Sequence, residues 1–204
     1  MKKLFAFILA LALCAASAFA EATPQPSPEA AFTPTDSTIL VACFSATDNT
    51  WPLAEYAAAS LNADLFRIEP EIPYTEADLN YGDSDSRANR EMNDETSRPA
   101  LKATVENVAQ YDTILLGFPI WWGQAPRLIE TFIEAHDLSG KTILPFCTSG
   151  GSGYGQTGEI LAALTDETVT WLEGRRFPAS ATAEEIAAWL QEMAIEPYAP
   201  SEEE

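Results

Sequence analysis

Three apolar segments of strand length limit what this chain can fold into more than any other feature. They cover residues 39–44 (ILVACF), 113–118 (TILLGF) and 142–147 (TILPFC). None of them alternates apolar with polar residues, so each is expected to be a strand buried on both of its faces. Strands of that kind are typical of parallel sheets, in which helices cover both faces. The three segments therefore predict an α/β fold.

The rest of the chain supplies the other elements that such a sheet needs. Two further strands are expected near residues 64–69 and 169–172. Helices are expected near residues 51–61, 100–109, 126–135, 156–164 and 183–193, the last of which opens with a capping box of Thr182 and Glu185. Because parallel strands are joined by right-handed crossovers, the helices must lie on both sides of the sheet. We predict a three-layer sandwich around a five-stranded parallel sheet.

A loop with potential ligand-binding residues directly follows each of the three apolar strands. Open parallel sheets bind ligands at the carboxyl ends of their strands, where these loops are expected to meet. The first loop is rich in hydroxyls and amides, the second carries two tryptophans, and the third is rich in glycine. The candidate site residues are Ser45, Ala46, Thr47, Asp48, Asn49 and Thr50 in the first loop, Pro119, Ile120, Trp121, Trp122 and Gly123 in the second, and Thr148, Ser149, Gly150, Gly151, Ser152 and Gly153 in the third.

Each loop suits one part of a phosphorylated, planar ligand. Backbone N–H groups at the start of a helix, together with hydroxyl side chains, bind a phosphate without any lysine. Adjacent residues point in opposite directions, so at least one of Trp121 and Trp122 should face the rim as a stacking surface. Glycines let a planar ring approach the backbone closely. Each loop on its own also fits a plainer role in helix capping, core packing or a flexible turn.

Between residues 36 and 193 the sequence resembles flavodoxin, and more narrowly the flavodoxin-like proteins with a Pro-Ile-Trp-Trp loop after strand three. The first loop of such proteins usually reads Ser-x-Thr-Gly-Asn-Thr. Here Ser45, Thr47, Asn49 and Thr50 match this pattern, and Asp48 stands in place of the glycine. The resemblance implies the strand order 2-1-3-4-5 of flavodoxin itself, FMN as the cofactor and electron transfer as the function.

Two other functions stay open beside electron transfer. One is an NAD(P)H-dependent quinone or small-molecule reductase that uses FMN on the same fold. The other is a flavin-free binding module that has lost phosphate affinity through Asp48. The usual glycine suggests a positive φ at this position, which Asp adopts more readily than most residues. We expect the Asp48 side chain to turn outward to solvent or to cap the helix that follows.

A long segment without a regular pattern, residues 72–99, follows the second strand. It carries Tyr74 and Tyr81 and leaves the same rim of the sheet as the three loops. Loops of this length are often lids or binding loops, so the segment is a candidate for contacting a redox partner or a substrate. The alternative is a solvated excursion with a short helix near residues 87–93. Its Asp spacing does not match a calcium-binding EF-hand loop.

Both ends of the chain fall outside the predicted domain, which covers residues 36–195. Residues 1–20 begin with two lysines before an apolar stretch, and they predict a signal peptide cleaved between Ala20 and Glu21. Residues 21–35 are proline-rich and predict a disordered linker, and residues 196–204 predict an acidic disordered tail. We therefore expect a secreted or extracytoplasmic protein, with an uncleaved anchor as the alternative.

Charge and composition disfavour several classes of partner. The chain has 31 acidic and 11 basic residues and a net charge of −20, which disfavours nucleic acid and anionic membranes. A metal site is not expected, because one histidine and the two separated cysteines that follow the predicted signal peptide do not make a zinc site. His136 should be a surface residue at a helix C-terminus, where the helix dipole favours it. Cys43 and Cys147 should be buried thiols beside the ligand site, too far apart for a disulfide.

Motifs of other nucleotide-binding proteins and of hydrolases are absent or misplaced. The chain has no Gly-x-x-x-x-Gly-Lys loop for a nucleoside triphosphate. Residues 153–158 read Gly-x-Gly-x-x-Gly, with Glu173 downstream, but this run does not directly follow its strand and lies in the fourth βα unit. Ser152 lacks the second glycine of a Gly-x-Ser-x-Gly elbow, and the histidine precedes it, contrary to the hydrolase order. A dinucleotide site stays a minor alternative.

Overall fold

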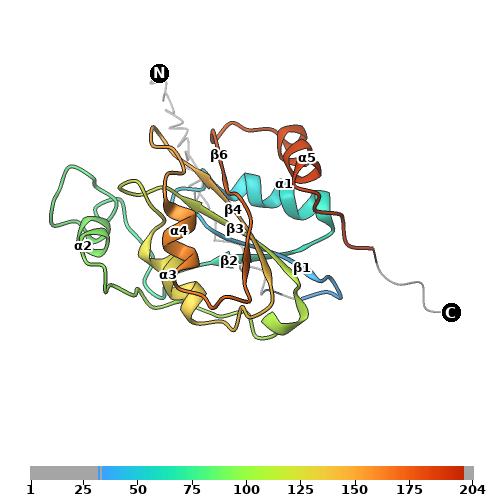
Figure 1. The fold of residues 1–204 in the computed structure, drawn as a ribbon. Helices are drawn as coiled ribbons and strands as arrows, with labels where there is room; N and C mark the ends of the chain where they lie inside the picture. The colour runs from blue at the N-terminus through green and yellow to red at the C-terminus, as the bar shows by residue number, and fades with distance from the viewer. Residues whose placement is uncertain (1–31, 33, 200–204) are drawn as a thin grey trace, which may run out of the picture. The chain divides into compact units, whose positions relative to one another are not determined.

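The apolar segments form the centre of one parallel sheet in the computed structural model, which describes residue 32 and residues 34–199 (Figure 1). The central strands are β1 (Ile39–Phe44), β3 (Thr113–Pro119) and β4 (Thr142–Thr148), and β2 (Asp64–Ile68) flanks β1. The strand order is β2-β1-β3-β4-β5, and all pairs are parallel. The predicted fold and strand order are therefore confirmed.

The far edge of the sheet is built from two short strands in place of one longer strand. β5 (Thr170–Trp171) pairs with the start of β4, and β6 (Arg175–Phe177) pairs with its end. β6 was not predicted, because three residues that begin with two arginines carry no strand pattern. β6 matters for the site because it brings the basic residue Arg176 beside the loop that follows β4.

Burial on both faces follows from the uninterrupted apolar strands. Leu40, Ala42 and Phe44 pack into the core on one face of the sheet, and Val41 and Cys43 pack into the core on the other. Helices α1 (Trp51–Leu61) and α5 (Ala183–Glu192) cover the second face. Helices α2 (Arg87–Asn93), α3 (Arg127–Glu134) and α4 (Thr157–Ala162) cover the first. The three layers can be followed in Figure 1.

Helix ends carry the capping chemistry that the sequence indicates. The capping box at the start of α5 is confirmed: the Thr182 hydroxyl accepts from the Glu185 backbone, and the Glu185 carboxylate accepts from the Thr182 backbone. α1 has a proline in its first turn, where no intrahelical donor is lost. It ends at Asn62, whose left-handed conformation (φ 50°, ψ 41°) closes the helix.

The predicted helix over residues 100–109 is wrong. Its first part pairs with the chain after β2: Lys102 donates to the Glu69 carbonyl (2.9 Å), and Glu71 donates to the Ala100 carbonyl (2.8 Å). These bonds between segments far apart in sequence override the local helix preference. Only a short 3-10 helix, Val108–Gln110, remains.

The prediction for His136 also needs correction, because this residue is a half-buried bridge and not a surface cation. Its Nδ1 bonds to the Phe132 carbonyl (2.7 Å), and its Nε2 accepts the Val105 backbone N–H (2.9 Å). An Nε2 that accepts a hydrogen bond belongs to a neutral ring whose Nδ1 carries the proton. Burial lowers the pKa of His136 in agreement with this assignment.

At each end of the chain, a residue outside the predicted domain limits is hydrogen-bonded to the domain. The Thr35 backbone and hydroxyl donate to the Asp64 carboxylate, and the Tyr198 backbone donates to the Leu61 carbonyl. The predicted signal peptide lies outside the described residues, as do most of the predicted linker and the last five residues of the predicted tail. Within residues 34–199, no helix is long and apolar enough to cross a membrane.

Candidate functional site

A pocket of about 410 Å³ opens at the carboxyl ends of β1, β3 and β4. Each of the three predicted loops contributes three residues to its wall: Ala46, Thr47 and Asn49, then Pro119, Ile120 and Trp121, then Thr148, Ser149 and Gly150. Three more residues, Leu79, Tyr81 and Ala179, complete it. The pocket lies where the strand order reverses between β1 and β3, the position at which open α/β sheets bind ligands.

The first loop folds back on itself before α1 begins. The Thr50 backbone N–H donates to the Ser45 hydroxyl (3.1 Å), and the Asn49 amide donates to the Thr47 hydroxyl (2.9 Å). Thr50 is fully buried, and its hydroxyl shares a hydrogen bond of 2.8 Å with the hydroxyl of Thr148 in the third loop. The first and third loops are thus connected at the base of the pocket.

Asp48 adopts the left-handed backbone conformation expected from the sequence. Its φ is 55°, as predicted. Its side chain is 69% exposed and turns away from the loop to form an ion pair with Arg67. Arg67 was not predicted as a site residue. It comes from β2, far from the loop in sequence, so only the folded chain reveals the pairing.

The second loop is a tight hairpin with an unusual residue in its turn. Trp121 and Gln124 exchange two backbone hydrogen bonds of 2.9 and 3.0 Å. The two residues between them, Trp122 and Gly123, both have positive φ (48° and 83°), as a type I′ turn requires. Positive φ is uncommon for a residue as bulky as tryptophan and is found where surrounding contacts enforce it.

The two tryptophans have different environments, one buried and one exposed, as expected for adjacent residues that point in opposite directions. Trp121 is only 4% exposed and packs edge-on against Phe44 and Tyr74 while forming part of the pocket wall. Trp122 is 42% exposed and does not line the pocket. Its ring lies against that of Tyr81, with 4.5 Å between the centroids.

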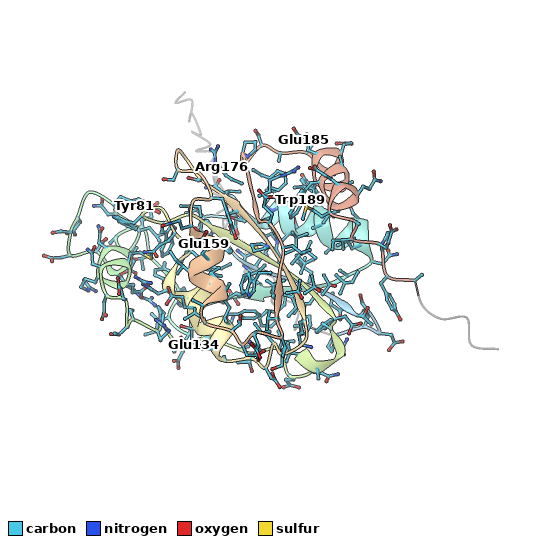
Figure 2. The ribbon with its side chains drawn as sticks, viewed as in Figure 1. Tyr81, Glu134, Glu159, Arg176, Glu185 and Trp189 are labelled. Carbon is cyan, nitrogen blue, oxygen red and sulfur yellow. The ribbon has the colours of Figure 1, made fainter. Side chains whose placement is uncertain are left out.

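Tyr81 reaches the pocket from the segment of residues 72–99 and is labelled in Figure 2. The amide of Asn89, a buried residue of α2, holds this segment by donating to the carbonyls of Asp83 (2.5 Å), Asn80 and Tyr81 (3.4 Å each). Both sequence interpretations of the segment are thus represented: it contains the short helix α2, and it also forms a wall of the pocket. The local sequence did not show that Leu79 and Tyr81 would provide that wall.

The third loop is fixed at its start and open beyond it. Arg176 of β6, labelled in Figure 2, donates to the Ser149 carbonyl (2.7 Å), and the Ile120 backbone donates to the Thr148 carbonyl (2.8 Å). Gly150 lines the pocket, whereas Gly151, Ser152 and Gly153 are exposed and do not. Ser45, Asp48, Thr50 and Gly123 also lie outside the pocket lining, although the first three shape the first loop.

In the glycine pattern of residues 153–158, the last glycine, Gly158, has a packing role that it shares with Gly174. A Cβ on Gly158 would lie 2.9 Å from the Tyr154 hydroxyl oxygen, and one on Gly174 would lie 2.6 Å from it. The two glycines therefore make room for the Tyr154 ring, which packs against the core. None of these residues lines the pocket. The dinucleotide interpretation gains no support from the structure.

Neither thiol near the site is suited to nucleophilic chemistry. Cys43 and Cys147 are free and buried, as predicted, with β3 between their strands. Burial raises the pKa of Cys147 to about 12 and raises that of Cys43 further, so both stay protonated at neutral pH. Among the described residues, no group of His, Cys, Asp or Glu side chains is arranged to hold a metal ion.

Fold and pocket together define a doubly wound α/β protein with a small-molecule site at its topological switch point. The chain belongs to the flavodoxin family, whose sequence profile matches residues 38–193. No curated protein sequence gives a significant match to it.

Solved structures similar to this chain are flavoproteins or flavoprotein candidates. A candidate flavoprotein from Bacteroides eggerthii is 46% identical over 78% of this chain and 99% of its own length, with a TM-score of 0.73. One from Bacteroides uniformis is 41% identical over 76% and 98%, with a TM-score of 0.72. A flavoprotein from Lactobacillus acidophilus in complex with FMN is 21% identical over 68% and 92%, with a TM-score of 0.57, which shows a shared fold.

Proposed function

We propose that this protein binds FMN non-covalently in the pocket at the ends of β1, β3 and β4 and transfers electrons outside the cytoplasm. The observation that supports the proposal most is that the three loops predicted to bind the phosphate, the ring and its polar edge all line one pocket. FMN supplies the redox chemistry of its isoalloxazine ring, and the protein supplies binding, orientation and electrostatics.

The residues present fit FMN in volume and in chemistry. A pocket of about 410 Å³ is within the range of small-molecule sites. Hydroxyls and backbone N–H groups of the first loop, at the start of α1, suit the phosphate. Trp121 and Tyr81 offer aromatic surface for the ring, and the backbone of Ser149 and Gly150 suits its polar edge. The FMN complex of the Lactobacillus acidophilus flavoprotein, which has the same fold, supports this assignment.

The flavin-free alternative rested on the extra negative charge of Asp48. In the structure this carboxylate points out of the loop and is paired with Arg67, and the loop keeps its hydroxyls and its helix N-terminus. The ion pair therefore supports a working phosphate site over a lost one.

A flavin reductase is the second candidate, favoured by the wall that residues 72–99 contribute to the pocket. Leu79 and Tyr81 are placed where they would control which molecules reach a bound ring. Oxidation of NADH or NADPH by the FMN-loaded protein, with a quinone as acceptor, would favour this function over electron relay alone.

The direct test is the visible spectrum of the purified mature protein. After incubation with FMN and removal of free ligand by gel filtration, we expect the flavin absorption bands to co-elute with the protein in equimolar amount. Elution of colourless protein, with all flavin in the small-molecule fraction, would contradict the proposal.

A further inference from the structure

Arg67 makes three contacts around the first loop, although it belongs to β2. Its Nη2 donates to the Ser45 carbonyl (3.3 Å) and forms the ion pair with Asp48. Its guanidinium also lies over the Trp51 ring, 4.5 Å from the ring centroid, at the first residue of α1. The loop is therefore held at its first residue, at its fourth residue and at the helix that follows.

These contacts suit an arginine specifically. The planar guanidinium can stack on an indole face and donate to two oxygens at the same time, whereas a lysine ammonium cannot reproduce this geometry. The Arg67 side chain is 31% exposed, so its charge is only partly screened by water.

The net charge around the first loop depends on Arg67. Asp48 is the single acidic residue among Ser45–Thr50, and the first turn of α1 contains none. With Arg67 in place, the loop and its partner are neutral together. Without Arg67, the Asp48 charge would be uncompensated beside the loop that is proposed to hold the phosphate, and like charges repel.

We propose that Arg67 is a positioning residue for phosphate recognition: it neutralises Asp48 and holds the first loop in the conformation that binds the phosphate. This inference rests on the proposed FMN site, and it names the residue that offsets the carboxylate of Asp48 in the first loop. The preference for a phosphorylated flavin over an unphosphorylated one should then fall when the Asp48–Arg67 pair becomes more negative and rise when it becomes more positive.

The test compares the dissociation constants of FMN and riboflavin, measured by quenching of flavin fluorescence, for the parent and three variants. Arg67→Ala should lower the preference for FMN about fivefold to tenfold, the scale of a partly screened charge acting on a phosphate dianion. Asp48→Gly should raise the preference by a similar factor. The double variant should return close to the parent value, because the charges again cancel.

Two further variants separate charge from folding. Arg67→Gln keeps a donor for the Ser45 carbonyl but has no charge, so it should behave like Arg67→Ala if neutralisation dominates. Arg175→Ala removes an arginine from another exposed ion pair, with Glu192, and should leave the preference for FMN unchanged. Circular dichroism of each variant checks that it is folded, and 0.5 M salt should reduce the differences among the Arg67 and Asp48 variants.

The outcomes distinguish this inference from the proposed function. If the parent prefers FMN but Arg67→Ala, Arg67→Gln and Asp48→Gly all keep the parent preference, the role of Arg67 is overturned while the FMN site stands. A double variant that keeps the lowered preference of Arg67→Ala, so that removal of the Asp48 carboxylate restores nothing, would overturn charge cancellation and with it the inference. If the parent binds neither flavin, both the proposed function and the role of Arg67 are wrong.

Discussion

At the scale of single residues, Gly117 shows how tightly the side chains of the central strands pack. It lies in β3 opposite Cys43 of β1 and Phe146 of β4. A Cβ at this position would be 2.9 Å from the Cys43 sulfur and closer still to the Phe146 ring. The glycine is therefore required by packing beneath the pocket.

We predict that Gly117→Ala lowers the free energy of unfolding by about 1–3 kcal/mol, the usual cost of overpacking a filled core. Urea denaturation of the apoprotein measures it. Gly150→Ala is the matched control, because a Cβ there meets nothing within 4 Å, and it should be neutral or slightly stabilising. Equal stability of Gly117→Ala and the parent would contradict the packing account.

His136 gives the native state a pH dependence of defined sign. Burial lowers its pKa below 6.5, so the unfolded chain binds the proton more tightly. The stability from neutral His136 is fully present above about pH 6.5 and is lost as the pH falls through the lower native pKa. The bond from the Val105 backbone to Nε2 disappears with protonation.

Urea denaturation of the parent and of His136→Gln between pH 8 and pH 4.5 tests this sign. We expect the parent to lose stability relative to the variant as the pH drops below about 6.5, because glutamine does not titrate. A stability difference that stays constant over the whole range would mean that His136 does not change its charge in this window.

At the scale of elements, the segment of residues 72–99 and the Trp121–Gln124 hairpin each contribute an aromatic residue to the pocket wall, Tyr81 and Trp121. The ring of Trp122, which is not part of the wall, lies against that of Tyr81. Trp122 supports Tyr81 from outside the pocket, and Trp121 lies in the pocket wall itself.

We predict that Tyr81→Ala weakens binding of FMN and of riboflavin equally, by about 1–3 kcal/mol, since it removes contact with the ring and none with the phosphate. Trp122→Asn, which tolerates the positive φ of the turn, should have a smaller effect of the same kind. Fluorescence titrations with both flavins measure these losses. Unchanged affinities in Tyr81→Ala would mean that the ring binds elsewhere.

Local sequence patterns predicted most elements because each has its own signal. β1, α1 and the capping box of α5 lie where the apolar runs and Thr182 indicate. β6 and the extended chain over residues 100–105 could not be predicted, because pairing with distant strands or carbonyls creates them. The three loops and the segment that carries Tyr81 were identified from sequence, whereas Arg67, Leu79 and Ala179 were not singled out, because only the folded chain brings them to the site.

At the scale of the whole molecule, the net charge of −20 is the dominant electrostatic feature. A strongly acidic surface attracts cationic partners over long range and repels anionic ones, and salt weakens both effects. Under the proposed electron-transfer function, the surface charge determines which acceptors approach the flavin quickly.

We predict opposite salt dependences for two small acceptors. Electron transfer from the reduced FMN-loaded protein to hexaammineruthenium(III), a cation, should slow as ionic strength rises, whereas transfer to the anion ferricyanide should quicken. Stopped-flow absorbance at several salt concentrations measures both rates. Rates that are independent of salt for both acceptors would show that the acidic surface does not face the route to the flavin.

The measurement that tests the central claim most directly is a titration of the purified protein with FMN and, separately, with riboflavin, followed by flavin fluorescence. The two ligands share the ring and differ in the phosphate that the first loop is proposed to bind. We predict saturable one-to-one binding of both, with FMN bound more tightly by at least about tenfold, as expected for several hydrogen bonds to a charged group. Equal affinities, or no binding of FMN, would contradict the account.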